Sequence, residues 1–240
     1  MEIYNQLKHS MRNYLQKYHL EGEEVTIRAA PLSTDEAIGN PEDRDYPLIT
    51  GRERMMQAEF KGALGQAYTD MYGDYTGKVS DIVEMEMSNN FRRAIFIAGL
   101  NAVMRHLGLI DQTIHCKDNE PRECAFHLNK YILKKYGRPK IAMVGLQPRM
   151  VETLSQDFDV RVTDLDNANI NTKKCGVMVQ DPEKSQENMK WCDLAIVTGS
   201  TIVNNSIGHF LTDKPVVFFG VTIAGAAKIL DLENFCFCAT

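Results

Sequence analysis

The order of hydrophobic and polar positions differs between the two halves of the chain. In the first half, apolar residues spaced three and four apart predict an amphipathic helix over 3–18 and a buried helix over 90–107. Alternation and β-branched residues predict strands over 24–30, 60–69 and 82–87. This mixture indicates an α+β arrangement for the first half.

The second half alternates short apolar runs with helical segments. The runs cover residues 140–146, 160–164, 176–179, 194–198 and 215–221. Alternation of this kind predicts a parallel sheet that is buried on both faces. The break at Gly137 to Pro139 separates the two patterns, so we expect an α+β domain over 1–137 and a Rossmann-like α/β domain over 138–240.

Composition and charge exclude several classes of function. The chain has 27 Lys and Arg against 32 Asp and Glu, a formal net charge of −5, which argues against a nucleic-acid partner. The first twenty residues carry charges throughout, and no apolar run is long enough to span a bilayer. We therefore expect a cytoplasmic protein without a membrane partner, whose six cysteines stay reduced for metal binding, catalysis or packing.

The first two strand ends of the second half resemble a nucleotide fold only in part. Gly145 opens the sequence GLQPRM, which lacks the later glycines of a dinucleotide fingerprint and argues against NAD or FAD. Asp164 lies where such folds place a ribose-binding acid. A carboxylate that only caps its own loop would give the same pattern, and both interpretations stay open.

The third strand end gives the most specific signal for a ligand. Thr198, Gly199, Ser200 and Thr201 follow an apolar run, and a helix is expected from about Ile202, with Asn204 in its first turn. Hydroxyls and unpaired amides at a helix start would receive an anion or a carbonyl oxygen. The alternative is that Ser200 or Thr201 is simply a helix cap. No complete catalytic motif is visible, so the catalytic residues are unknown.

Soft metal ligands cluster in one segment. His115, Cys116, Cys124 and His127 fall within thirteen residues and could hold zinc or another thiophilic transition-metal ion. Their spacing matches no standard zinc finger, so packing in the core remains an alternative. Cys236 and Cys238 are expected on a final strand, facing the same side, with packing as the default interpretation.

An ordered set of motifs gives a family resemblance. VGLQPRMVETL at 144–154, VTDLD at 162–166 and CDLAIVTGSTIVNNSI at 192–207 resemble the family named for heavy-metal chelation, domain of unknown function 364. The segments 92–108 and 115–125 resemble it as well. The resemblance implies an N-terminal domain similar to the enolase capping domain, a Rossmann-like domain and a ligand site in the cleft between them. Carried over by position, the cleft residues are Asn101, Gly145, Pro148, Asp164, Thr198 to Thr201 and Asn204. Thr222 stands near a turn where relatives carry Gly-Pro-Ser, and its hydroxyl is expected to substitute.

Three functions remain open. We favour a protein that binds a small molecule or metal chelate in an interdomain cleft, with a role in heavy-metal handling. An enzyme acting on a nucleotide-like or anionic small molecule is the alternative. The third is an oligomeric scaffold that uses the charged stretch 33–54 as its interaction surface. The sequence leaves homo-oligomer formation open.

Overall fold

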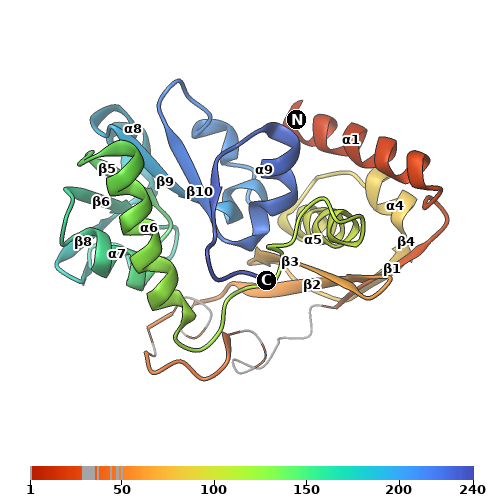
Figure 1. The fold of residues 1–240 in the computed structure, drawn as a ribbon, viewed down its shortest axis with the longest axis horizontal. Helices are drawn as coiled ribbons and strands as arrows, with labels where there is room; N and C mark the ends of the chain where they lie inside the picture. The colour runs from red at the N-terminus through yellow and green to blue at the C-terminus, as the bar shows by residue number, and fades with distance from the viewer. Residues whose placement is uncertain (1, 29–35, 37, 44, 47–48, 50) are drawn as a thin grey trace.

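The computed structural model describes residues 2–28, 36, 38–43, 45–46, 49 and 51–240, and places two β-sheets side by side (Figure 1). The first sheet is antiparallel with the order β3-β2-β1-β4. Its strands are β1 (Glu24–Arg28), β2 (Arg54–Phe60), β3 (Ala63–Thr69) and β4 (Tyr75–Lys78). Residues 29–30 of the first expected strand, and part of the 33–54 stretch, lie outside the described residues.

A tight turn divides the expected strand over 60–69. Lys61 and Gly62 both have positive φ, 49° and 81°, as a two-residue hairpin turn requires. The predicted strand over 60–69 therefore covers the turn and the second strand, β3, of a hairpin. The sequence pattern did not predict the first strand of this hairpin, β2.

Helices cover one face of the first sheet. α5 (Asn90–His106) packs on β2 and β3, while α4 (Val79–Glu84) and α1 (Glu2–Tyr18) lie further out (Figure 1). Both predicted helices are confirmed. The expected strand over 82–87 is wrong, because residues 82–84 form the end of α4. At the start of this helix, the Asp81 side chain accepts a hydrogen bond from Lys78 N.

α5 lies unusually close to β3. A Cβ at Gly65 would lie 2.2 Å from Ala102 N, so only glycine allows the helix backbone to approach the strand this closely. Residues 93–104 of α5 are all buried, as expected for a helix with apolar residues on every side of its middle turns. It forms the centre of a core that includes residues from both sheets.

The second sheet has the order β11-β10-β9-β5-β6-β8-β7 and is parallel except for β7. Its strands are β5 (Ile141–Val144), β6 (Val160–Thr163), β7 (Lys173–Lys174), β8 (Val177–Gln180), β9 (Leu194–Thr198), β10 (Val216–Phe219) and β11 (Asn234–Phe235). The predicted α/β alternation and the fold class are confirmed. The expected division at 137/138 stays a prediction.

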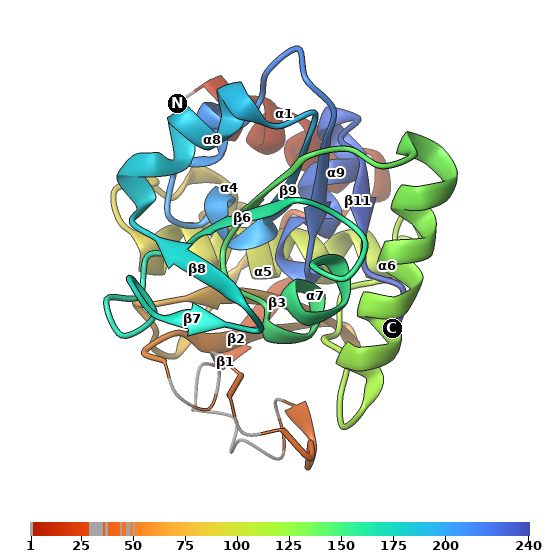
Figure 2. The same ribbon diagram turned by 90° about the vertical axis from the view of Figure 1, so that its left-hand side faces the viewer.

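Four helices of the described chain accompany this sheet (Figure 2): α6 (Glu120–Tyr136), α7 (Pro148–Leu154), α8 (Ser185–Trp191) and α9 (Ala224–Leu230). α6 packs against α7 and buries Cys124, Leu128 and Ile132 with the apolar residues of β5 and β6. The chain then returns from β11 to the first half, where Thr240 O accepts hydrogen bonds from Thr113 N and Ile114 N.

Candidate functional site

The strand order reverses beside β5, because β6 lies on one side of it and β9 on the other. Ligands of open parallel sheets bind beyond the strand ends at such a switch point. Here the two strand ends approach each other very closely. Gly145 has φ of +88°, and a Cβ at this position would lie 2.7 Å from Thr198 Cγ2.

The side-chain hydroxyls of the turn after β9 bond within the turn itself. Thr201 Oγ1 donates to Thr198 O at 2.7 Å, and the hydroxyls of Thr198 and Ser200 lie 3.1 Å apart. Ser200 N donates to Thr198 Oγ1 at 3.4 Å, while Gly199 packs against Ile223. The expected helix from Ile202 is wrong, because a short 3-10 helix over Gly199–Ile202 takes its place. A helix dipole therefore no longer supports anion binding at this turn.

The other predicted cleft residues also bond within the chain. Asn204 Oδ1 accepts from the amide and hydroxyl of Ser206 at 3.1 and 2.6 Å. Asp164 accepts from Leu146 N at 2.6 Å and from Asp166 N at 2.8 Å, so it closes the turn after β5. Pro148 is buried in the first turn of α7.

Asn101 and Thr222 join the first sheet to the second. Asn101 is fully buried, and its amide nitrogen donates to Gln66 O at 3.0 Å and to Val221 O at 3.2 Å. Its oxygen accepts from Gly225 N at 2.9 Å. Thr222 Oγ1 accepts from Tyr68 N at 3.0 Å. These two side chains hold the end of β10 against β3.

Four cysteines from three separate segments lie together next to this junction. They are Cys116, Cys124 on α6, and Cys236 and Cys238 in the turn after β11; we call them the thiol cluster. All four are free thiols, and only Cys238 is not buried. The final strand ends at Phe235, so the strand expected to carry Cys236 and Cys238 is wrong, although the two thiols do lie near each other.

The surroundings of Cys124 favour its thiolate form. Interactions with the Cys236 thiol and with the backbone of Cys238 and Phe237 lower the pKa of Cys124, although burial opposes this shift. Burial raises the pKa of Cys116 well above its usual value. Burial and the negative charges of Cys124 and Glu123 raise that of Cys238 to about 12. The cluster thus favours one thiolate surrounded by neutral thiols.

The two predicted histidine ligands have other partners. His115 Nδ1 lies 2.6 Å from Cys116 O, and burial lowers the pKa of this imidazole. His127 stacks on Phe237 with ring centroids 3.7 Å apart. Among the described residues, no group of three or more His, Cys, Asp or Glu side chains forms a ready set of metal ligands.

The sequence pattern did not identify Glu53 and Tyr68. Burial, followed by the charges of Asp164, Asp70 and Asp166, raises the pKa of Glu53 to about 7. Burial also raises the pKa of Tyr68, and the charges of Cys116 and Glu53 add to the effect. Tyr68 packs against the small apolar cluster that contains Cys236. Glu53 belongs to a stretch rich in charges, where no spacing distinguished it.

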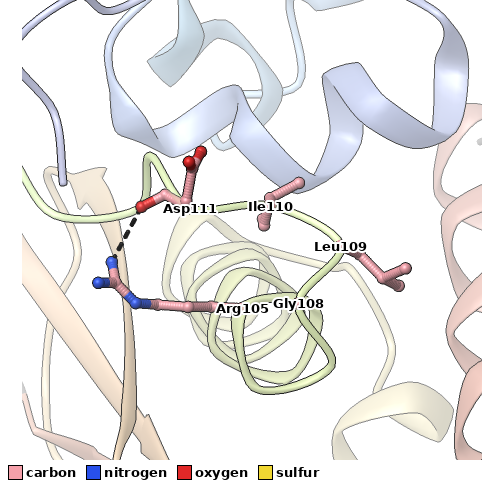
Figure 3. A pocket seen from close by; sticks show the side chains of 5 residues that line it. All are labelled: Arg105, Gly108, Leu109, Ile110 and Asp111. Atoms are coloured by element: carbon pink, nitrogen blue, oxygen red, sulfur yellow. Dashed lines mark hydrogen bonds between the residues drawn. The ribbon is translucent and has the colours of Figure 1, made fainter.

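Two open hollows of the described structure lie away from the strand ends and the thiol cluster. One, of about 400 Å³, is lined by Arg105 and by residues 108–111 (Figure 3). The other, of about 280 Å³, lies between residues 109–112 and α9. Arg105 already donates to Asp111 O, Thr113 Oγ1 and Thr240 O, so its guanidinium is occupied within the chain.

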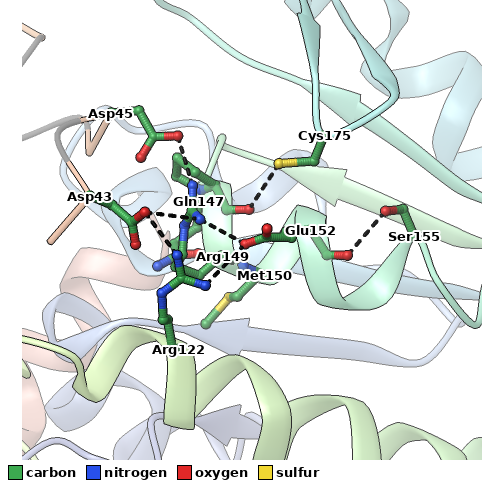
Figure 4. A network of polar contacts seen from close by, with 10 residues as sticks. Asp43, Asp45, Arg122, Gln147, Arg149, Met150, Glu152, Ser155 and Cys175 are labelled. Atoms are coloured by element: carbon green, nitrogen blue, oxygen red, sulfur yellow. Dashed lines mark hydrogen bonds and ion pairs between the residues drawn. The ribbon is translucent and has the colours of Figure 1, made fainter.

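A polar network ties the loop before β2 to α7. Arg149 contacts Asp45 at 2.8 Å, Glu152 at 2.7 Å and Asp43 at 3.4 Å, and Arg122 reaches Asp43 from α6 at 2.8 Å (Figure 4). The Arg149 side chain is only 8% exposed. The network therefore fixes described residues of this loop on the second sheet.

Comparisons with known proteins agree with the fold. Residues 130–232 match the model of the family described as "Putative heavy-metal chelation", domain of unknown function 364, and the resemblance read from the motifs is confirmed. A protein with unknown function from this family, from Pyrococcus horikoshii, has a TM-score of 0.58 and 16% identity, covering 92% of this chain and 79% of that one.

A second solved structure of that family, from Desulfitobacterium hafniense DCB-2, has a TM-score of 0.53 and 11% identity. It covers 74% of this chain and 72% of that one. No curated protein matches the chain. No described helix is both long and apolar enough to cross a membrane.

Proposed function

We propose that this protein, whose residues 130–232 match a family named for heavy-metal chelation, binds a thiophilic metal ion through the thiol cluster. The observation that carries the proposal is the convergence of Cys116, Cys124, Cys236 and Cys238 from three chain segments. Sulfur donors select soft ions such as zinc, cadmium or monovalent copper. A set of four thiols supplies as many donors as a tetrahedral ion requires.

The surroundings of the cluster suit a cation. Glu120 and Glu123 lie close enough to raise the pKa of Cys238 by their negative charge. The same charges attract a metal ion to the half-buried edge of the cluster, where Cys238 is the most accessible thiol. An ion that enters there meets Cys124 and Cys236 next.

The four sulfurs do not form a ready ligand set, so binding requires a rearrangement. Cysteine side chains have one rotatable bond with three staggered positions, and a change of rotamer turns a sulfur without moving the backbone. The thiols that bind the metal release their protons. Binding is therefore expected to weaken as pH falls.

A reducing compartment would keep the thiols available. Cytosolic thiol pools maintain cysteines in the reduced state, which supports a cytoplasmic location as part of the proposal. A small polar ligand at the strand ends has less support, because Asp164, Ser200 and Asn204 already bond within the chain.

Cadmium titration tests the proposal. The reduced full chain should bind one equivalent of Cd²⁺ by elemental analysis and develop the ultraviolet absorption of a cadmium–thiolate bond. Cys124→Ser and Cys236→Ser should weaken binding by more than about tenfold. Cys192→Ser and Cys175→Ser are matched controls, because one removes a buried thiol and the other an exposed thiol outside the cluster. Equal binding by all four variants would refute the proposal.

A further inference from the structure

We propose that Arg122 and Arg149 form a binding site for a small phosphorylated molecule, and that the carboxylates of Asp43 and Asp45 cover this site in the present structure. The site is built from α6, α7 and the loop before β2 (Figure 4). It uses none of the thiols of the proposed metal site, so the inference stands apart from the proposed function.

The two guanidiniums share the same carboxylates. Arg122 donates to Asp43 Oδ1 at 2.8 Å, and Arg149 donates to the same oxygen at 3.4 Å. Glu152 Oε2 lies 2.7 Å from Arg149 and 3.6 Å from Arg122. The guanidiniums therefore lie together between the loop and Glu152, as Figure 4 shows. Two arginines held this close concentrate positive charge, and their paired N–H groups suit the oxygens of a phosphate or a carboxylate.

The loop carboxylates do not satisfy Arg149 completely. The Arg149 side chain is only 8% exposed, and its buried Nε has no hydrogen-bond partner within the described structure. Asp45 accepts from Arg149 through Oδ2 alone, at 2.8 Å, and its buried Oδ1 has no partner there either. Buried polar atoms are normally paired, and a well-matched carboxylate binds a guanidinium through both oxygens. The unpaired donor therefore indicates a better-fitting partner than the loop.

A phosphate group matches what the two loop carboxylates supply. Asp43 and Asp45 bring two negative charges to the guanidiniums, and a phosphate monoester carries about −1.5 to −2 at pH 7 on three accepting oxygens. The exchange thus leaves the net charge of the network nearly unchanged while Glu152 stays in place. One phosphate oxygen can accept from the free Nε of Arg149 while the others bridge to Arg122. A monocarboxylate brings less charge and fewer oxygens.

The site is accessible from solvent. The Arg122 side chain is 46% exposed, and those of Asp45 and Glu152 are 40% and 39% exposed. Arg149 lies in the first turn of α7, which follows β5, the strand beside which the order of the sheet reverses. Ligands of open parallel sheets bind near such a strand end. A ligand therefore reaches the guanidiniums once the two loop carboxylates withdraw.

The loop carboxylates act as an internal competitor of the ligand. They occupy the donors that a phosphate needs, so the apparent affinity falls with the fraction of molecules in which the site is open. Bound phosphate in turn keeps Asp43 and Asp45 away from α7. Ligand binding is therefore coupled to the position of this loop.

Binding of inorganic phosphate to the full chain, measured by isothermal titration calorimetry, tests the inference. The double variant Asp43→Asn with Asp45→Asn removes the competitor, so its Kd for phosphate should fall by at least about tenfold. Adding Arg149→Ala to the double variant should abolish this gain. Arg122→Ala, at an exposed position, should do the same and replaces Arg149→Ala if that protein does not fold.

A charge-matched control separates the site from a general gain in positive charge. Glu23→Gln with Glu84→Gln removes two carboxylates from exposed ion pairs with Lys61 and Arg12. This control has the same net charge as the double variant of the loop, and it should bind phosphate no better than the natural protein. Acetate should bind the loop variant more weakly than phosphate does.

Protease cleavage gives a second measurement that needs no variant. A saturating concentration of phosphate should speed cleavage of the natural protein in the loop around Asp43 and Asp45, compared with chloride at the same ionic strength. Unchanged cleavage would overturn the inference. Equal phosphate affinity of the loop variant and the natural protein, an equal gain in the charge-matched control, or tighter binding of acetate than of phosphate would overturn it as well.

Discussion

Replacing Asn101 by alanine should cost the protein much of its stability, because this amide connects four separate segments. Asn101 on α5 is fully buried and bonds to Gln66 O of β3, to Val221 O and Thr222 O of the following turn, and to Gly225 N of α9. Asn101→Ala leaves the Gly225 N–H without a partner in the core. The three carbonyl oxygens also lose their shared donor.

The expected loss follows from these bonds. A buried donor left unpaired costs about 1–3 kcal/mol, and the carbonyls and the small void add to this, so we expect a total of about 3 kcal/mol. For a chain of this size the melting temperature should fall by roughly 6–12 °C. Equilibrium unfolding in urea, followed by circular dichroism and by the fluorescence of the single tryptophan, measures the change.

A matched control separates burial from residue type. Asn13→Ala on the exposed side of α1 should change the free energy of unfolding by no more than about 0.5 kcal/mol. A loss below about 1 kcal/mol for Asn101→Ala would refute the reasoning. Unchanged stability with loss of a small-molecule ligand would instead support the binding role that the family resemblance implies for Asn101.

Gly145→Ala combines left-handed strain with a contact at 2.7 Å from Thr198, whereas Gly176→Ala, at φ of +85° with open space around it, carries the strain alone. Urea unfolding should show the larger loss for Gly145→Ala, and equal losses would contradict the clash. The raised pKa of Glu53, about 7, means that the folded state holds this proton more tightly than the unfolded state. The free energy of unfolding should therefore fall as pH rises from the ordinary carboxyl pKa range through 7. In Glu53→Gln the free energy of unfolding should change less with pH over this range. If the natural protein and the variant show the same pH dependence, Glu53 is not its cause. Arg149→Ala should release the loop around Asp43 and Asp45 from α7 and make a protease cleave this loop faster. Arg138→Ala is the control, because its ion pair with Asp157 is exposed, and it should leave the cleavage rate unchanged. Equal cleavage rates for the two variants would count against the role of Arg149.

The parallel sheet could be predicted from sequence because buried strands have a strong local signature. Val197 and its neighbours form a short apolar run between helical segments, and such a run indicates a buried strand before any of its tertiary contacts are known. The pattern failed at Ile82 to Met87, where alternating Met and Glu imitate a strand beside a short helix. It failed again after Thr198, where hydroxyl bonds within the turn favour a 3-10 helix.

The candidate site could be predicted only in part. Cys116 and Cys124 were identified because they are close in sequence, but their partners Cys236 and Cys238 lie more than a hundred positions away. Their approach depends on residues 235–238 running along α6, which local patterns do not encode. Thr198 and Asp164 were placed correctly at strand ends. Their hydrogen bonds within the chain depend on side-chain geometry that the sequence does not specify.

The central position of α5 has a consequence for how the molecule can be divided. Its buried side chains share one core with Ala142, Val197 and Phe218 of the second sheet. A fragment over 138–240 would expose this apolar surface to water and tend to self-associate. The two halves should therefore melt in a single cooperative transition, and neither is expected to be an autonomous folding unit.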